Sequence, residues 1–340
     1  MGGEGVNNKV VVLDKWFSFG PALTNAEFSK LSREYTHVVA LTYPHEVKYD
    51  VNFLKSLGIE VLEVPVPDFR SPPLLDLAFI VEWILSRIDS GGRVYVHCAR
   101  GYGRSATVAA AYLIRKHGKN WLESVDRIRK LREGSLESVE QLSVLKAYDT
   151  LLRYLNPAEL LNSLKCQDKQ SRDHVSKVLQ LGLKNSDAIA SLTKIPQDLL
   201  IQELFSSVNQ YLNSQKLGCI FMKLPNISNL NLNQLNNDLA SVLKTYAELF
   251  IVADEPRNQC VEDLEIRTEG NNLVEAVLYC SADLMSSCSI VKRRVENSLS
   301  KMCEVLGYSV KTITLGFLNI RAKFLGLSQA SLKTLSPANE

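Results

Sequence analysis

The sequence has 340 residues, of which 46% are hydrophobic and 22% are charged, and its formal net charge is +2. This length exceeds one ordinary domain and fits two, and the composition is typical of a globular protein. The small net charge makes nucleic acid an unlikely partner on bulk electrostatics. Apolar runs fall short of the ~20 residues that a spanning helix needs, so we expect no membrane span.

The cysteine pattern and the N-terminal residues indicate the cellular compartment in which the protein is expected. The seven cysteines form no Cys-x-x-Cys pair and are odd in number. This pattern predicts neither a disulfide framework nor a zinc site, and it is typical of a reducing cytoplasm. The N-terminal residues lack the basic-then-apolar pattern of a signal peptide. We therefore expect a cytoplasmic protein that uses no metal or other cofactor, with an oligomeric state that the sequence leaves open.

Apolar stretches alternate with helical patterns at the start of the chain. Residues 16–20 are aromatic-rich and lead into a turn at Pro21. The alternation predicts an α/β sheet covered by helices. The predicted strands are 10–13, 37–41 and 59–66, and the predicted helices are 25–34 and 49–57.

A proline-bearing loop follows the third predicted strand. Residues 66–73 read Val-Pro-Asp-Phe-Arg-Ser-Pro-Pro. The helical pattern after them has a stripe of apolar side chains that faces a core. Two carboxylates, Asp68 in the loop and Asp76 in the first helical turn, lie in this region. The place of Asp76 favours a role at the helix N-terminus.

The next strand, loop and helix carry the chemistry. Residues 93–97 predict a buried strand, and an alanine-rich helix begins after the loop and closes at Gly118. Such a junction presents backbone N–H groups to an anion. Cys98 opens the loop, where the amides and the helix dipole stabilise a thiolate. Arg104 closes the loop and can hold two phosphate oxygens, and the Ser105 hydroxyl can hydrogen-bond the sulfur.

The sequence His-Cys, five residues, then Arg-Ser resembles the signature of cysteine-based protein tyrosine phosphatases in the compact dual-specificity branch. The resemblance covers residues 9–155 and implies attack by Cys98 on phosphorus through a cysteinyl-phosphate intermediate. The residues that it implies for phosphate binding are Ala99, Arg100, Gly101, Tyr102, Gly103 and Arg104.

Two further roles follow from the same resemblance. It implies that Asp68 is the general acid and then the base, since its loop lies at the matching upstream position. It also makes Gln141 a candidate for placing the hydrolytic water, although a glutamine at the start of a helix is common for capping alone. Ser105 is expected to assist departure of the thiolate. His97 is expected to fix the cysteine loop rather than to titrate.

A helix over 121–132 and another that ends near residue 155 complete this half. The basic residues of the first of these helices are expected on a solvated face. They are Arg127, Arg129, Lys130 and Arg132.

The remaining sequence shows no catalytic constellation. We predict a catalytic domain over 1–155, a helical segment over 156–215, and an α+β domain of unknown role over 216–340, of split β-α-β type. The helical segment has predicted breaks at Gly182 and at Ile195-Pro196 and a helix-turn-helix rhythm without basic residues, which favours packed helices over DNA reading.

Within the α+β domain, the predicted helices are 232–246 and 285–306. The predicted strands are 219–224, 249–253, 264–268, 273–280 and 308–315, with a turn at 270–272.

These predictions indicate a phosphomonoesterase that acts on phosphotyrosine, phosphoserine and phosphothreonine of proteins. Two alternatives stay open. Arg70 and Arg100 add positive charge that would suit a phosphoinositide or an RNA 5′ phosphate. A phospho-binding module without turnover is the other alternative, but such modules normally lack the cysteine, arginine or aspartate that this chain retains.

Overall fold

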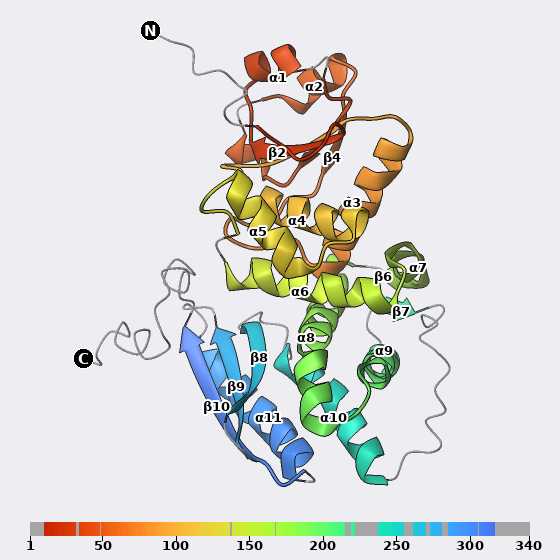
Figure 1. Ribbon diagram of the computed structural model, residues 1–340, viewed down its shortest axis with the longest axis vertical. Helices are drawn as coiled ribbons and strands as arrows, with labels where there is room; N and C mark the ends of the chain where they lie inside the picture. Colours follow the sequence, from red (N-terminus) through yellow and green to blue (C-terminus); the bar gives the residue numbers. More distant parts are fainter. Residues whose placement is uncertain are drawn as a thin grey trace, which may run out of the picture.

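The computed structural model describes residues 10–316, apart from positions 32–33, 48, 137, 167, 215–218, 222–236, 255–260, 270–272, 281–284 and 305. The molecule is elongated, with the first half of the chain at one end and the C-terminal sheet at the other (Figure 1). The turn predicted at 270–272 lies outside the described residues. No helix in the described part of the chain has the length and apolarity to cross a bilayer.

A five-stranded mixed sheet forms the centre of the first half, as the predicted fold class requires. Its order is β1-β2-β5-β3-β4, and only the β1–β2 pair is antiparallel among these strands. The elements are β1 (Val11–Val12), β2 (Phe17–Pro21), α1 (Asn25–Leu31), β3 (His37–Ala40), η2 (Pro44–Glu46), α2 (Val51–Ser56), β4 (Glu60–Glu63), α3 (Leu74–Asp89), β5 (Val94–Cys98), α4 (Arg104–His117), α5 (Trp121–Leu131) and α6 (Val139–Tyr154).

The central strand β5 is buried on both faces. Successive side chains of a strand point to opposite sides of the sheet, so they enter two different cores. Val94, Val96 and Cys98 belong to the large core that includes residues of α3 and α4. Tyr95 packs instead with Phe28 in a smaller core under α1 and α2. The strand therefore has two hydrophobic layers to hold it, and its carboxyl end carries Cys98 into the following loop.

The prediction for residues 16–20 was wrong, because they form most of strand β2 rather than an approach to a turn. Phe17 pairs in parallel register with Val94 of β5, and Pro21 pairs with Cys98. Phe17 and Phe19 are fully buried, and the Phe17 ring stacks on Tyr112 of α4 at 4.3 Å. Burial of these aromatic rings offsets the presence of glycine and proline, which weaken strands.

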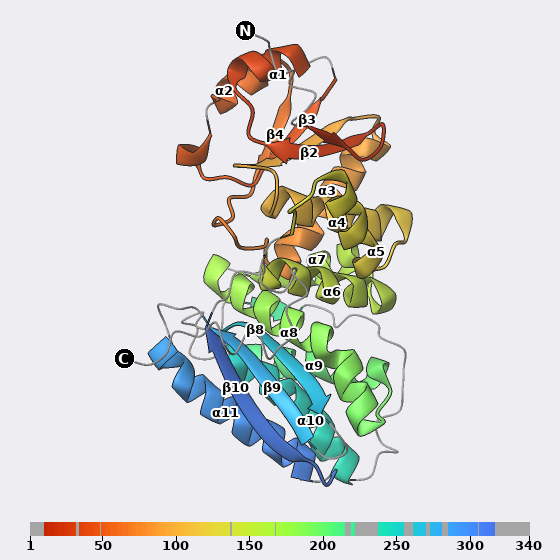
Figure 2. The same ribbon diagram turned by 60° about the vertical axis from the view of Figure 1, so that its left-hand side comes forward.

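Helices and a small α+β unit make up the second half, as predicted. Strands β8 and β9 form an antiparallel hairpin, and β10 lies parallel to β9 after the crossover helix α11. Figure 2 shows this sheet beside α8, α10 and α11. The elements are α7 (Pro157–Ser163), β6 (Leu164–Cys166), α8 (Lys169–Thr193), α9 (Gln197–Ser214), β7 (Cys219–Phe221), α10 (Asn237–Ala253), β8 (Val261–Glu269), β9 (Leu273–Cys280), α11 (Met285–Glu304) and β10 (Ser309–Gly316).

Two local predictions in this half were wrong. Residues 249–253 are the last turns of helix α10 rather than a strand, and Tyr246 contacts Phe250 edge-to-face one turn apart. A short apolar run cannot distinguish a buried helix from a strand by its pattern alone. Helix α8 also runs unbroken through Gly182, where a Cβ atom would meet the Leu204 side chain at 2.4 Å. This glycine serves the close packing of α8 against α9.

The short strands β6 and β7 also differ from expectation. Strand β7 pairs with β6 in a separate two-stranded sheet and takes no part in the C-terminal sheet. Cys166 in β6 is disulfide-bonded, whereas the cysteine pattern predicted no disulfide framework. Cys98, Cys280, Cys288 and Cys303 are buried thiols outside any disulfide.

A buried polar network joins the two halves of the chain across α6, α8 and β8. The Asp263 carboxylate of β8 is fully buried. It accepts a hydrogen bond from Ser143 of α6 at 2.9 Å and is paired with Lys184 of α8. Asn185 donates to the Leu264 carbonyl at 2.9 Å and accepts from the Ile266 amide at 3.1 Å. Side chains of α8 thus satisfy backbone groups of the edge strand β8, which would otherwise lack partners.

We expect Lys184→Met to lower the free energy of unfolding by about 3 kcal/mol, because it leaves the Asp263 carboxylate buried without its counter-charge. Asp263→Asn in the same chain should recover much of that loss. Lys146→Met is a matched control, since Lys146 pairs with the exposed Asp187, and such pairs contribute less than about 1 kcal/mol. Denaturant unfolding measures all three, and equal losses from Lys184→Met and Lys146→Met would contradict the network's importance.

Candidate active site

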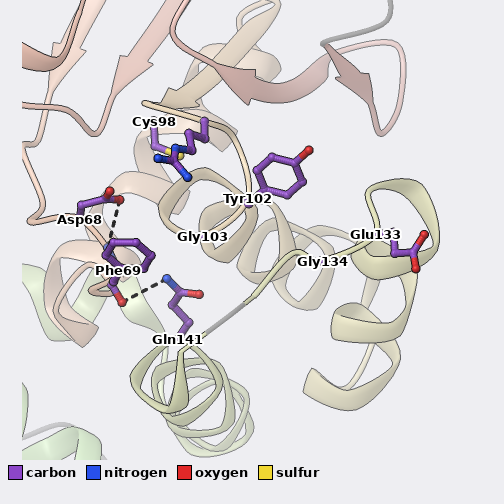
Figure 3. A pocket seen from close by; sticks show the side chains of 9 residues that line it. Asp68, Phe69, Cys98, Tyr102, Gly103, Glu133, Gly134 and Gln141 are labelled. Carbon is purple, nitrogen blue, oxygen red and sulfur yellow. Dashed lines mark hydrogen bonds between the residues drawn. The ribbon is translucent and has the colours of Figure 1, made fainter. Parts of the chain in front are cut away.

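The loop between β5 and α4 lies at the bottom of a cavity of about 330 Å³. This is the carboxyl end of a parallel strand, where open α/β sheets bind ligands. The cavity brings together three predicted site residues from separate segments, Asp68, Cys98 and Gln141 (Figure 3). The full lining is Asp68, Phe69, Cys98, Arg100, Tyr102, Gly103, Glu133, Gly134 and Gln141.

The Cys98 sulfur has two polar neighbours. The Gly101 backbone amide donates to Sγ at 3.2 Å, and Ser105 Oγ lies 3.3 Å from it. Ser105 Oγ also lies 3.2 Å from the Gly20 carbonyl oxygen. The hydroxyl has a single proton, so it donates either to this carbonyl or to the sulfur. This arrangement suits a serine that donates a hydrogen bond to a thiolate.

Position 101 requires glycine both for its backbone conformation and for lack of space for a side chain. Its φ is +82°, in the region that favours glycine. A Cβ atom here would lie 2.5 Å from the Gly20 carbonyl carbon and 2.7 Å from the Pro21 nitrogen. The loop therefore curls around the sulfur only because β2 and residue 101 approach with no side chain between them.

Arg104 is held by Glu46, which the sequence analysis did not identify. The guanidinium is 1% exposed, and Glu46 takes Nη1 and Nη2 in a bidentate pair at 3.0 and 2.7 Å. Nη1 also donates to the Val66 carbonyl at 2.8 Å. Burial is the largest influence on the pKa of Arg104 and lowers it, but the hydrogen bonds to Glu46 together with the charges of Cys98, Asp68 and Glu46 raise it overall. The same contact lowers the pKa of Glu46.

One edge of the Arg104 guanidinium is left for an anion. Nε is buried and has no hydrogen-bond partner, and Nη2 lies 3.0 Å from Asp68 Oδ1. Nε and Nη2 form the edge that accepts two oxygens of a phosphate or carboxylate. Asp68 is half-exposed and occupies only one position of this edge, so a bound phosphate would compete with Asp68 for Nη2.

Asp68 reaches the site on a loop bent at Phe69. Phe69 has a φ of +63° and is half-exposed, and its amide donates to the Asp68 carboxylate at 3.1 Å (Figure 3). A positive φ is a true outlier for a bulky residue. The bend turns Asp68 toward Arg104 and leaves the Phe69 ring at the cavity wall. Asp76, the rival carboxylate, does not line this cavity and pairs with Arg172 of α8 at 3.1 Å.

Gln141 caps helix α6 and also contacts the Asp68 loop. It forms a capping box with Ser138 at the start of α6. Its side-chain amide also donates to the carbonyls of Phe69 and Arg70 at 3.4 and 3.3 Å, and it is 1% exposed. A Cβ atom at Gly103 would lie 2.6 Å from this amide. Gln141 therefore lies between the signature loop and the Asp68 loop.

Of the four basic residues expected on a solvated face, Arg127 and Lys130 are exposed as expected, whereas Arg129 and Arg132 are partly buried and contact neighbouring segments. Arg132 lies over the Tyr102 ring at 4.0 Å and donates to the Arg100 carbonyl at 2.9 Å. Arg129 donates to the Leu136 carbonyl at 3.3 Å, and burial lowers its pKa to about 10. Arg132 thus contacts the signature loop directly, and Arg129 holds residues 135–136, where the Leu136 amide donates to the Tyr102 carbonyl.

The remaining predicted phosphate-binding residues follow the loop. Arg100, Tyr102 and Gly103 line the cavity, whereas Ala99 does not. The Ala99 carbonyl accepts from the Ala22 amide at 3.4 Å. Arg70 lies outside this cavity and pairs with Glu140 at 3.4 Å. Its charge is therefore directed to α6 rather than to the rim.

His97 is buried beneath the loop. Its Nε2 lies 2.9 Å from the Tyr49 hydroxyl, and burial lowers its pKa to about 4. A neutral imidazole near neutral pH fits the expectation that His97 supports the loop rather than titrating in turnover.

Comparisons with known proteins agree with this geometry. Residues 25–150 match the family model described as the dual specificity phosphatase catalytic domain. Dual specificity protein phosphatase 1B of Arabidopsis thaliana is 31% identical over 127 residues, which are 37% of this chain and 71% of that protein. The chain belongs to the cysteine-based protein tyrosine phosphatase superfamily, in its dual-specificity branch.

The chain is also similar to a second curated relative and to a solved structure. Rattus norvegicus phosphatidylglycerophosphatase and protein-tyrosine phosphatase 1 is 35% identical over 109 residues, or 30% of this chain and 56% of the relative. The chain thus spans about half the length of that relative. The structure of Tk-PTP in its active form is 33% identical, with a TM-score of 0.41, covering 42% of this chain and 96% of that one.

We expect His97 to make the stability of this phosphatase-family chain depend on pH. Its folded pKa of about 4 lies below the unfolded value of 6.5. The unfolded chain therefore binds the proton first as pH falls, so stability is complete above pH 6.5 and declines toward pH 4. From pH 7 to pH 5 the loss from this group should be about 2 kcal/mol.

Denaturant unfolding of the wild type and of His97→Gln at both pH values isolates this contribution. The difference in unfolding free energy between the two proteins should shrink by about 2 kcal/mol at pH 5. A difference that is the same at both pH values would show that His97 is not the group responsible.

Proposed function

We propose that this protein is a phosphomonoesterase that removes phosphate from phosphorylated proteins through a cysteinyl-phosphate intermediate. The observation that carries the proposal is the Cys98 sulfur at the bottom of a cavity, next to a buried arginine. The Gly101 amide and the Ser105 hydroxyl contact the sulfur, and the Arg104 guanidinium, whose Nε has no partner, interacts with it electrostatically. A thiolate with amide and guanidinium donors is suited to attack on phosphorus and to stabilising the equatorial oxygens.

In the first step, the Cys98 thiolate attacks phosphorus while the bond from phosphorus to the leaving oxygen breaks. Arg104 Nε and Nη2, with the loop amides from Ala99 to Gly103, hold the three remaining oxygens. The phosphate takes the position on Nη2 that Asp68 occupies. Asp68, in its protonated form, gives its proton to the leaving oxygen.

In the second step, water attacks the phosphocysteine and the sulfur–phosphorus bond breaks. Asp68 accepts a proton from the water, and Ser105 donates to the departing thiolate. Gln141 is placed to orient this water because its amide lies between the signature loop and the Phe69 carbonyl. Phosphate then leaves, and Asp68 returns to Arg104.

The side chains at the rim of the cavity favour a protein substrate, and they suit phosphotyrosine as one of the accepted residues. Phe69 and Tyr102 both line the cavity and are 49% and 36% exposed, and Arg132 fixes the Tyr102 ring from behind. Exposed aromatic rings on both sides of the sulfur can contact a phosphotyrosine ring.

A lipid phosphate is the second candidate. The name of the rat relative includes phosphatidylglycerophosphatase activity, and Arg100 lines the cavity with a cationic side chain. Hydrolysis of phosphotyrosine and phosphothreonine peptides, phosphatidylglycerophosphate, a phosphoinositide and 5′-phosphorylated RNA, compared by kcat/KM, decides between the classes. The highest value for a peptide supports the proposal, and the highest value for a lipid or RNA contradicts it.

We expect Cys98→Ser to abolish turnover and to leave the binding of inorganic phosphate intact, because the amides and Arg104 remain. Phosphate release assays and isothermal calorimetry measure the two effects. Turnover above a trace in this variant would refute the mechanism. A wild-type chain that binds phosphopeptides without hydrolysing any substrate would instead identify a binding module.

We expect Asp68→Asn to slow the reaction by about 10²–10⁴-fold for substrates with poor leaving groups. An aryl phosphate with a very acidic phenol should lose far less, because its leaving oxygen hardly needs a proton. Asp76→Asn tests the rival carboxylate on the same segment. If Asp76→Asn gave this dependence on the leaving group and Asp68→Asn did not, the assignment of the acid would be wrong.

A further inference from the structure

The helix that follows the Asp68 loop is capped by the second half of the chain. Pro73 occupies the N-cap position of α3 and supplies no side-chain hydrogen bond. The Leu75 amide, in the first turn, donates instead to Ser176 Oγ of α8 at 3.0 Å, in a buried contact. Free amides at a helix start need a partner, and a hydroxyl is a preferred one.

A second contact joins the same turn to the same helix. Arg172, one turn before Ser176 on α8, lies 3.1 Å from Asp76 Oδ1 through Nε. Its Nη2 donates to the Leu75 carbonyl at 3.4 Å. Ser176 thus binds the backbone amide of Leu75, and Arg172 binds the backbone carbonyl of the same residue.

Two attachments of the Asp68 loop come from the family domain. Arg104 donates to the Val66 carbonyl at the loop's start, and Gln141 donates to the middle of the loop. The attachment at the loop's end comes from beyond residue 150, where the family match stops. We propose that Arg172 and Ser176 are positioning residues for Asp68, so that α8 is a working part of the catalytic unit.

A second cavity lies beside the Asp68 loop and gives it room to move if the contacts of Arg172 and Ser176 are lost. About 280 Å³ of space lies between the loop and α8. Its lining includes Pro67, Arg70, Ser71 and Pro73 of the loop and Lys177 of α8. This space separates lining residues of the loop from those of α8, so the polar contacts at the loop's end add to the restraint that Arg104 and Gln141 supply. Removing them allows the loop to move into the cavity and away from the sulfur.

This inference rests on the proposed function, because it concerns the delivery of the proton by Asp68. The test compares Arg172→Met and Ser176→Ala with the wild type in the full-length chain. Substrates are an aryl phosphate with a highly acidic phenol and an alkyl phosphate with a poor leaving group. Orthovanadate binding reports whether the signature loop and Arg104 are intact. Arg115→Met is the matched control, since Arg115 pairs with Glu82 further along the same helix at 2.8 Å.

We expect kcat for the alkyl phosphate to fall about 10- to 100-fold in Arg172→Met, as for a catalytic group displaced by about 1 Å. Ser176→Ala should give a smaller loss of the same kind. The activated aryl phosphate and the orthovanadate Kd should change less than about twofold, and Arg115→Met should match the wild type. Arg172→Lys, which keeps the charge beside Asp76, should recover part of the loss.

Three results would overturn the inference. Equal losses on both substrates or loss of orthovanadate binding would show a general structural defect. Unchanged rates on both substrates would show that α8 does not position the loop. A wild-type chain without any phosphatase activity would overturn the proposed function and this inference together, which separates that failure from the other two.

Discussion

The Arg104 guanidinium is almost completely buried and connects segments that are distant in the sequence. It donates to the carbonyls of Leu41 and Val66 and pairs with Glu46 and Asp68. A buried guanidinium without such partners would cost several kcal/mol. The fold can therefore keep the cation next to Cys98 only if the end of β3, the η2 turn and the Asp68 loop all take their observed positions. The geometry of the anion site follows from satisfying this one charge.

The residues of the signature loop could be predicted because their pattern is local. A β-branched strand, two glycines and an alanine-rich helix fix the positions of Cys98, Arg104 and Ser105 within a few residues of each other. Asp68 was also predicted to reach the site, and it lies 3.0 Å from Arg104. Glu46 could not be found in this way. It stands in a three-residue turn with no periodicity, and its partner is 58 positions away.

The same distinction explains the errors in the fold. Residues 17–21 form a strand because a partner 77 positions later, β5, pairs with them and buries two phenylalanines. Residues 249–253 are helical because they continue α10, which packs on α8, α9 and α11. In each case the local pattern allowed more than one structure. Contacts with elements far away in the sequence decided between them.

The contacts of the Asp68 loop differ in strength in a way that suits its proposed role. Gln141 and Ser176 are buried, and they hold the loop after Asp68 through backbone groups of residues 69, 70 and 75. Asp68 itself is half-exposed and is held by an ion pair with Arg104 and by one adjacent amide. An ion pair exposed on one side contributes about 1 kcal/mol or less. A phosphate that grips two nitrogens of Arg104 can therefore displace the carboxylate at little cost, while the backbone that carries it stays in place. The side chain needs to move only from the guanidinium to the leaving oxygen.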